Sequence, residues 1–328
     1  MASKYAAVHA SPNGPGDSRP TAQQIIKDED LEGKLANKVI LITGCSSGIG
    51  IETAKALSTT GATLYLTARD LNKARTALGS LSEQSNIHLL ELDLESFASV
   101  RKCAAEFLSK SSTLNILINN AGVMIPPEGR TADGFETQFG TNHLAHFLLF
   151  QLLKDTLLVS ASPEMCSRVI MVSSSGHRAS EVQFDDYNFE KGYDAWKGYG
   201  QSKTAMIWAA NEIDARYGAR GLHSYSLHPG GIASGLQKYI PGELAKDWST
   251  IPGLAEARKS LEQGAATTVW AATARDLEGK GGKFLENCQI IGPLKEGDGL
   301  LVPGYAAWVY DGVKAKRLYE LSLELVEV

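Results

Sequence analysis

The chain has 328 residues, of which 43% are hydrophobic and 21% are charged. This is the composition of a globular protein with a sizeable core. Lysine and arginine number 32 against 37 aspartates and glutamates, so the formal net charge is −5. Because no basic excess is available to neutralise phosphates, we expect neither nucleic acid nor an anionic membrane surface as a partner.

The cysteines and the apolar runs indicate the compartment. Four scattered cysteines form no CxxC pair, so they support neither a disulfide framework nor a structural zinc site: Cys45, Cys103, Cys166 and Cys288. A reducing compartment is therefore expected, and no metal ligands are assigned. The chain shows no run of 18 apolar residues and no apolar signal-peptide core, so we expect no membrane span and a cytoplasmic location.

Residues 1–35 differ in composition from the rest. The stretch 11–20, SPNGPGDSRP, is rich in proline and glycine and predicts a flexible tail that buries little surface. Residues 21–28 have the pattern of a short helix. Deletion of residues 1–20 is therefore expected to leave folding and activity nearly unchanged.

From residue 38 onward, short apolar runs alternate with segments of helical periodicity. Strands are predicted at 39–42, 63–67, 87–92, 114–118, 168–173, 222–227 and near 283–290, and helices at 49–60, from 96, at 135–159 and at 199–217. This alternation predicts an α/β fold, with helices on both faces of a doubly wound parallel sheet of about seven strands. We expect one Rossmann-type domain over residues 36–328.

The first predicted strand runs into a glycine-rich turn, TGCSSGIG at 43–50. Glycines there let the backbone approach a ligand closely, and the following helix N-terminus offers N–H groups to a pyrophosphate. The strand-turn-helix context favours this interpretation over a structural turn. The stretch also matches the GxSxG elbow of α/β-hydrolases, with Ser46 as nucleophile, but that elbow normally follows several strands.

The end of the second strand bears on the choice of cofactor. An NAD site usually places an acidic residue there to accept from the ribose 2′-hydroxyl. Here Ala68 takes that place and Arg69 follows, and a guanidinium suits a 2′-phosphate. Asp70 is expected to cap the next helix, and Asp93 and Leu94, after the third strand, are placed to meet the adenine end.

A phenol and an ammonium, Tyr199 and Lys203, are spaced to share one helical face. A nearby lysine cation is expected to lower the pKa of the tyrosine, which can then exchange a proton with an alcohol or a ketone. The serines at 173–175 follow the fifth strand, and one of these hydroxyls is a candidate donor to the substrate oxygen. Asn142 lies inside an apolar helix and needs a polar partner.

Two histidines and a small-residue pair complete the candidate residues. His143 and His146 have no acidic partner at metal-ligand spacing, so they are expected to be core or surface residues. The fourth strand ends in an asparagine pair, and the Ala-Gly pair that follows it, residues 121–122, leaves room for a cofactor.

Taken in order, these motifs resemble a classical short-chain dehydrogenase/reductase over about residues 36–310. The matching motifs are TGCSSGIG at 43–50, NNAG at 119–122, Asn142, VSS at 172–174, Tyr199-x-x-x-Lys203 and HPG at 228–230. The NHLAHF run at 142–147 and the long insert before Tyr199 resemble the retinol dehydrogenase and WW-domain oxidoreductase branch. The usual threonine four residues after the HPG glycine is Ser234 here.

The resemblance implies roles for these residues. Tyr199 would be the general acid/base, Lys203 would hold the nicotinamide ribose, Ser174 would orient the carbonyl and Asn142 would support a water relay. The implied NADP(H)-binding residues are Gly44, Ser46, Ser47, Gly48, Ile49, Gly50, Arg69, Asp93, Leu94, Asn120, Ala121, Gly122, Tyr199, Lys203, Pro229, Gly230, Ile232 and Ser234.

We therefore expect an NADP(H)-dependent oxidoreductase that interconverts an alcohol and its aldehyde or ketone by hydride transfer. The expected substrate is a small apolar or aromatic molecule under an apolar lid near 234–260, whose side chains include Leu236, Tyr239, Ile240, Leu244, Trp248 and Ile251. Met124, Ile125 and Trp196 are further candidates for the pocket wall. A homodimer remains open, as does the alternative of an inactive NADP(H)-binding sensor.

Overall fold

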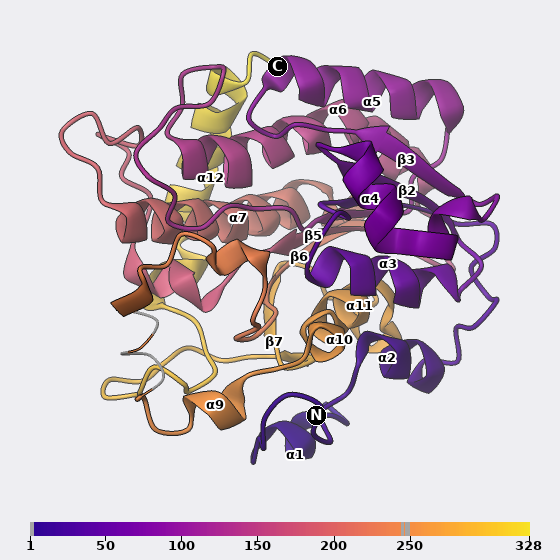
Figure 1. The fold of residues 1–328 in the computed structure, drawn as a ribbon. Helices are drawn as coiled ribbons and strands as arrows, with labels where there is room; N and C mark the ends of the chain where they lie inside the picture. Colours follow the sequence, from indigo (N-terminus) through magenta and orange to yellow (C-terminus); the bar gives the residue numbers. More distant parts are fainter. Residues whose placement is uncertain (1–2, 244–245, 247–249) are drawn as a thin grey trace.

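The computed structural model describes residues 3–243, 246 and 250–328, and Figure 1 shows their arrangement. The strands are β1 Val39–Thr43, β2 Thr63–Ala68, β3 Ile87–Glu91, β4 Ile116–Asn119, β5 Ser167–Val172, β6 Leu222–His228, β7 Lys283–Glu286 and β8 Gln289–Ile290. The helices are α1 Ala6–His9, α2 Ala22–Asp28, α3 Ile49–Ser58, α4 Leu71–Leu78, α5 Phe97–Lys110, α6 Ala145–Ser160, α7 Ala195–Tyr217, α9 Leu254–Ala257, α10 Leu261–Gly264, α11 Ala266–Thr273 and α12 Gly312–Leu325.

The strands form one sheet in the order β3-β2-β1-β4-β5-β6-β7-β8. Strands β1 to β7 pair in parallel, as the alternation of strands and helices predicts, whereas β8 is antiparallel to β7. The eighth strand was not expected. Asn287 and Cys288 both have positive φ, 56° and 54°, and two such residues form the tight turn of a hairpin. They split the predicted run 283–290 into β7 and β8.

Helices cover both faces of the sheet (Figure 1). Ile40 and Ile42 of β1 pack in the core formed with α2, α3 and α11, while Leu41 packs on the opposite face with α5, α6, α7 and α12. Alternate side chains of a strand point to opposite faces, and a strand buried on both faces is therefore apolar throughout. The expected doubly wound fold is confirmed.

Two helix boundaries near the site differ from the sequence-based expectation. The predicted helix 135–159 begins instead as a π-helical turn, Phe139–Leu144, which runs into α6. Helix α7 begins at Ala195 rather than at Tyr199, because the Asp194 side chain accepts hydrogen bonds from the Trp196 and Lys197 amides and caps it. Tyr199 therefore lies one turn inside α7.

The N-terminal residues pack on the domain, which differs from the predicted flexible tail. Tyr5 is 6% exposed, lies in the core and donates its hydroxyl to Asp28 Oδ2 at 2.8 Å. Arg19 is 4% exposed. The short helix expected over residues 21–28 is present as α2, with Thr21 as its N-cap. A proline- and glycine-rich segment thus docks through a few anchoring side chains, and composition alone does not reveal them.

Candidate active site

The carboxyl ends of five parallel strands meet at a cavity of about 1830 Å³. The residues that follow these strands line it: Gly44 after β1, Arg69 after β2, Asn120 after β4, Ser174 after β5 and Pro229 after β6. Ligands of open α/β sheets bind at this edge, where the strand order reverses. Here the reversal lies between β1 and β4.

The glycine turn after β1 tolerates no larger residue at two positions. Gly44 has a φ of +78°, and a Cβ there would lie 2.8 Å from the Cβ of Ala121. A Cβ at Gly50 would lie 2.3 Å from the carbonyl oxygen of Gly44 and 2.7 Å from Asn120 Nδ2. The backbone can therefore fold tightly enough to present the N-terminal end of α3 to the cavity, as an anion-binding turn requires.

Positive charge gathers at the end of the cavity beside β2. Arg69 and Lys73 both line it. Arg69 Nη1 donates to Glu95 Oε1 at 3.2 Å, and its side chain is 67% exposed. Asp70 Oδ1 accepts the backbone N–H groups of Asn72 and Lys73 as the N-cap of α4. That carboxylate is engaged by the helix, as predicted, so directly after β2 an arginine and not Asp70 lines the cavity.

The loop after β4 is held against β1. Asn120 Nδ2 donates to the Thr43 carbonyl oxygen at 2.8 Å, and Thr43 Oγ1 accepts the N–H groups of Asn120 and Ala121 at 2.9 and 3.0 Å. A Cβ at Gly122 would lie 3.0 Å from Asn142 Oδ1. Only small residues fit where this loop crosses the cavity floor.

Tyr199 and Ser174 come together at the ends of α7 and β5. Tyr199 is 3% exposed, and its hydroxyl is hydrogen-bonded to the Ser174 side chain. Gly176 lies against the ring, since a Cβ there would be 2.6 Å from Tyr199 Cε1. Ser173 instead donates its hydroxyl to the Lys203 carbonyl oxygen at 2.9 Å. Of these two serines, Ser174 is the one that reaches the phenol.

Burial sets the protonation of Tyr199 and Lys203. It raises the pKa of Tyr199 to about 12, and the hydrogen bond from Ser174 acts in the opposite direction. It lowers the pKa of Lys203 to about 7. Lys203 Nζ donates to the Val172 carbonyl oxygen at 2.9 Å and lies 5.7 Å from the centroid of the Tyr199 ring. The expected lowering of the tyrosine pKa differs from this result, because desolvation is the largest effect on both groups.

Asn142 is buried in the π-helical turn and joins two parts of the site. Its Oδ1 accepts the Val123 N–H at 2.8 Å, and its Nδ2 donates to the Val123 carbonyl and to Ser202 Oγ, both at 2.9 Å. Single π-helical turns often occur at functional sites. Asn142 does not line the cavity. It fixes the loop after β4 relative to α7.

The two histidines of this helix are structural. His146 Nε2 lies 2.9 Å from Thr43 Oγ1, and His143 Nε2 lies 2.8 Å from Ser322 Oγ. Burial lowers the pKa of His143 to about 3 and that of His146 to about 4. These contacts agree with the predicted core role. Within residues 3–243, 246 and 250–328, no group of three or more His, Cys, Asp or Glu is arranged to hold a metal ion.

Comparison with known proteins supplies the family. A sequence model described as short chain dehydrogenase matches residues 38–244. The chain belongs to the short-chain dehydrogenase family. The short-chain dehydrogenase/reductase prx1 of Penicillium roqueforti is 50% identical over 325 residues, which is 99% of this chain and 95% of that protein.

Two further relatives connect the family to the branch and to a cofactor. Retinol dehydrogenase 12 of Homo sapiens is 38% identical over 302 residues, covering 90% of this chain and 88% of that protein. The solved RhlG/NADP active-site complex of Pseudomonas aeruginosa has a TM-score of 0.62 and 26% identity, covering 78% of this chain and 96% of that chain. The expected resemblance to the retinol dehydrogenase branch is confirmed.

The structure of this short-chain dehydrogenase brings most of the predicted site residues to one cavity. Those that line it are Gly44, Ser46, Ser47, Gly48, Ile49, Arg69, Asp93, Leu94, Asn120, Ala121, Gly122, Ser174, Tyr199, Lys203, Pro229, Gly230, Ile232 and Ser234. Gly50 and Asn142 lie behind the wall and make contacts that shape it. The predicted residues thus form one continuous surface, although the sequence separates them by up to 190 positions.

Apolar side chains surround the mouth of the cavity. Met124, Trp196, Leu236, Tyr239 and Ile251 line it, as predicted from the sequence, whereas Ile125 and Ile240 do not and instead pack in the small cluster around Met124 and Tyr199. Of the predicted lid, Leu244 and Trp248 lie outside the described residues. No helix in the described part of the chain is long and apolar enough to cross a membrane.

Several cavity residues escaped the sequence analysis. The apolar rim at 300–302 lines the mouth, and so do the charged residues Arg19, Arg178, Lys259 and Glu286. The Leu-Leu-Val triplet lies between a glycine and a proline, and this pattern could have predicted an apolar loop at a binding site. The charged residues carry no such signal, because their partners are distant in sequence.

Proposed function

We propose that this short-chain dehydrogenase is an NADP(H)-dependent oxidoreductase that interconverts an apolar or aromatic alcohol and its aldehyde or ketone. One observation carries the proposal. A buried tyrosine hydrogen-bonded to Ser174, with Lys203 beside it, faces a cavity that has a glycine turn and cations at one end and an apolar mouth at the other.

The residues of the chain divide the task. Tyr199 donates its phenolic proton to the carbonyl oxygen in reduction and accepts one from the alcohol in oxidation. Ser174 donates a hydrogen bond to the same oxygen and holds the carbonyl in place. Lys203 would hold the ribose of the cofactor, and Asn142 holds α7 and the loop after β4 in register. When bound, the nicotinamide supplies or accepts the hydride.

The glycine turn and Arg69 support the choice of a phosphorylated dinucleotide. The turn leaves no space for side chains where backbone must approach a pyrophosphate, and α3 presents its N-terminus there. Ala68 takes the place where an NAD enzyme carries an acid, Arg69 follows it, and Lys73 of α4 lines the same end of the cavity. The ion pair between Arg69 and Glu95 is largely exposed and therefore weak, so a 2′-phosphate can replace the carboxylate.

The first test is a panel of aromatic, polyketide-like and terpenoid carbonyls, with NADPH oxidation as the measurement. Turnover of bulky apolar carbonyls is expected, with small polar ones poor in comparison because they leave the mouth unfilled. Binding of NADPH with no turnover across a broad panel of carbonyls and alcohols would favour the alternative of a cofactor-binding sensor.

The second test concerns cofactor choice. Arg69→Ala is expected to weaken NADPH binding about ten- to hundredfold, because hydrogen bonds to a charged group are worth about 1.5–3 kcal/mol, and to leave NADH binding nearly unchanged. Arg75→Ala is the matched control, since Arg75 is an exposed arginine of the helix α4 that follows Arg69 and does not line the cavity. An NADP(H) preference that survives Arg69→Ala would contradict this assignment.

A further inference from the structure

The N-terminal arm, defined here as residues 9–20, reaches the ligand cavity. His9, Ala10, Pro12 and Arg19 are among the lining residues. The family match begins only at residue 38, so this part of the wall lies outside the segment that identifies the family. The arm also lies beside α9 and α10 near the bottom of the molecule (Figure 1).

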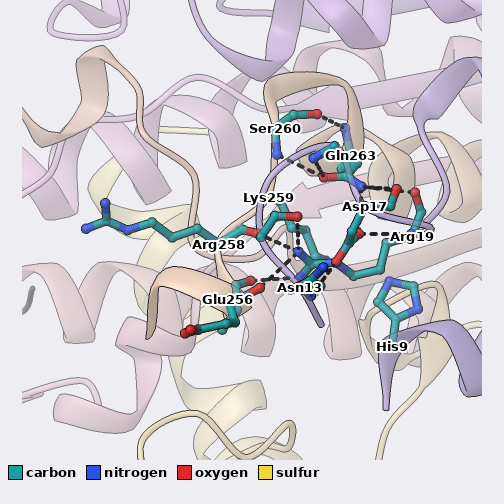
Figure 2. A network of polar contacts seen from close by, with 12 residues as sticks. His9, Asn13, Asp17, Arg19, Glu256, Arg258, Lys259, Ser260 and Gln263 are labelled. Carbon is teal, nitrogen blue, oxygen red and sulfur yellow. Dashed lines mark hydrogen bonds and ion pairs between the residues drawn. The ribbon is translucent and has the colours of Figure 1, made fainter. Parts of the chain in front are cut away.

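Arg19 is the centre of the contact between the arm and the domain (Figure 2). Its guanidinium donates to three successive backbone carbonyls, those of Glu256 (3.2 Å), Ala257 (2.8 Å) and Arg258 (2.6 Å). Its Nε donates to Asp17 Oδ1 at 2.8 Å. The last carbonyls of a helix lack intrahelical partners, and α9 ends at Ala257. Arg19 therefore satisfies the open end of α9 from outside.

The arm itself is braced by Gln263. Gln263 Nε2 donates to the carbonyl oxygens of Asp17 and Arg19, both at 3.1 Å, and its Oε1 accepts the Gly16 N–H at 2.9 Å. Gln263 is 1% exposed and belongs to the capping box of α10 with Ser260. The arm is thus hydrogen-bonded to residues 256–258 through Arg19 and to α10 through Gln263. These two contacts fix the position of the segment 256–259 relative to the domain.

Lys259, the residue after this segment's last Arg19 contact, connects the segment to the loop after β6 by hydrogen bonds. Its N–H donates to the Gly231 carbonyl at 2.9 Å, and its Nζ donates to the Pro229 carbonyl at 3.2 Å and to Asn287 Oδ1 at 2.8 Å. A Cβ at Gly230 would lie 2.8 Å from Lys259 Cδ. The side chain is 4% exposed. Lys259 therefore packs against the loop 229–231, which lines the cavity, and holds it in place.

From this chain of contacts we propose that the N-terminal arm is part of the ligand site and that Arg19 is a positioning residue. Arg19 holds residues 256–258, so that Lys259 fixes the loop 229–231 in the shape that receives the nicotinamide end of the cofactor. The inference rests on the proposed function for the identity of that ligand. It does not place Arg19 in the chemical step, because the proposed proton donor and carbonyl-binding residues are Tyr199 on α7 and Ser174 after β5.

The test measures Arg19→Met in the full-length chain. The Lys259 amide, which is bonded to Gly231, is expected to exchange with deuterium faster, and the Kd for NADPH is expected to rise about three- to thirtyfold, the usual range for residues that act through others. At saturating NADPH and carbonyl, kcat should change much less than Kd and KM. Arg19→Lys keeps the charge but loses the planar fork, so it should lie between wild type and Arg19→Met.

Arg101→Met is the matched control. Arg101 also fastens a chain end through a backbone carbonyl, with Nη2 donating to the Val326 carbonyl at 2.6 Å, but it does not line the cavity. It should lower Tm without changing the Kd for NADPH. If Arg19→Met lowers Tm while the Lys259 exchange and the Kd stay as in wild type, the arm only fastens the chain and the proposal is wrong.

Two outcomes separate this inference from its premise. If Arg19→Met does not fold, Arg19→Lys and Asp17→Asn carry the same comparison, because each alters the anchor while keeping side-chain size. If wild type binds no NADPH, the proposed function fails, and the exchange of the Lys259 amide alone decides between a positioning and a fastening role.

Discussion

At the scale of single residues, burial shifts the pKa values of the tyrosine and the lysine of the site in opposite directions. Tyr199, with a pKa raised to about 12, keeps its proton at neutral pH, and the same desolvation lowers the pKa of Lys203 to about 7. The site is therefore a proton donor at rest. Ser174 donates its hydrogen bond to the phenolic oxygen, which leaves the phenolic proton free for a carbonyl oxygen.

The catalytic assignment predicts a graded loss of activity. Tyr199→Phe removes only the hydroxyl, so fold and NADPH binding should survive while turnover falls about 10²–10⁴-fold. Ser174→Ala should lower turnover with little effect on NADPH affinity. The control is Ser173→Ala, because that hydroxyl bonds to the Lys203 carbonyl oxygen and not to Tyr199. Turnover and fluorescence titration with NADPH decide the matter, and near-normal turnover of Tyr199→Phe would show that another group supplies the proton.

The raised pKa of Tyr199 also fixes the sign of the pH dependence. Because the phenol stays protonated up to about pH 12, carbonyl reduction has its donor throughout pH 6–9, and at saturating NADPH any change of its rate in this range should follow Lys203, whose pKa is lowered to about 7. Alcohol oxidation needs the deprotonated form, so its kcat/KM should rise with pH, at most about tenfold per unit. Paired pH profiles of the two directions are the measurement. An oxidation rate that falls with pH would mean that a different group controls proton transfer.

At the scale of secondary-structure elements, the sequence predicts what depends on local pattern. Apolar runs locate β1 to β6, Asp70 is recognisable as a cap, and TGCSSGIG marks the turn to α3. The π-helical turn around Asn142 and the hairpin at Asn287 could not be predicted in this way. Both depend on backbone conformations that tertiary contacts impose on ordinary residues, here the bonds of Asn142 to Val123 and Ser202.

The glycine turn can be tested as an element. Gly50→Ala places a Cβ 2.3 Å from the Gly44 carbonyl oxygen, so the turn must open. We expect a loss of about 1–3 kcal/mol in the free energy of unfolding and weaker NADPH binding. Gly312→Ala is the control, since Gly312 begins α12 and nothing lies within 4 Å of its Cβ position. Unchanged NADPH binding in Gly50→Ala would show that the turn does not hold the cofactor.

At the scale of the whole molecule, the walls of the cavity come from segments that lie far apart along the chain. Arg19 fastens residues 256–258, and Arg178 donates in the same way to the carbonyls of Leu300 and Val302 in the apolar rim and of Gly304 just after it. Such bonds go to backbone oxygens, which every residue has, so no side-chain pattern reveals the partners. This is why the sequence predicts the residues that carry the chemistry but misses those that position the mouth and the arm.

Truncation of the arm is the clearest consequence at this scale. Composition alone predicts that loss of residues 1–20 is harmless, but the structure buries Tyr5 and Arg19. Losing one buried aromatic and a set of charge-assisted hydrogen bonds costs about 4–6 kcal/mol, which for a chain of this size lowers Tm by about 5–10 °C.

A shorter truncation is the control for that experiment. Removing residues 1–4 deletes the pair between Lys4 and Glu29, whose lysine side chain is 48% exposed, and a few hydrogen bonds of Ser3 and Lys4, and exposed pairs contribute little stability. Its Tm should therefore stay near that of the full chain, whereas loss of residues 1–20 should also loosen the segment that Arg19 holds and raise the Kd for NADPH. Calorimetry and NADPH titration of both truncations test this together. Removing a docked segment must remove the contacts that dock it and so lower Tm. Equal Tm values for the full chain and the longer truncation would therefore show that residues 1–20 form the flexible tail that the composition predicts.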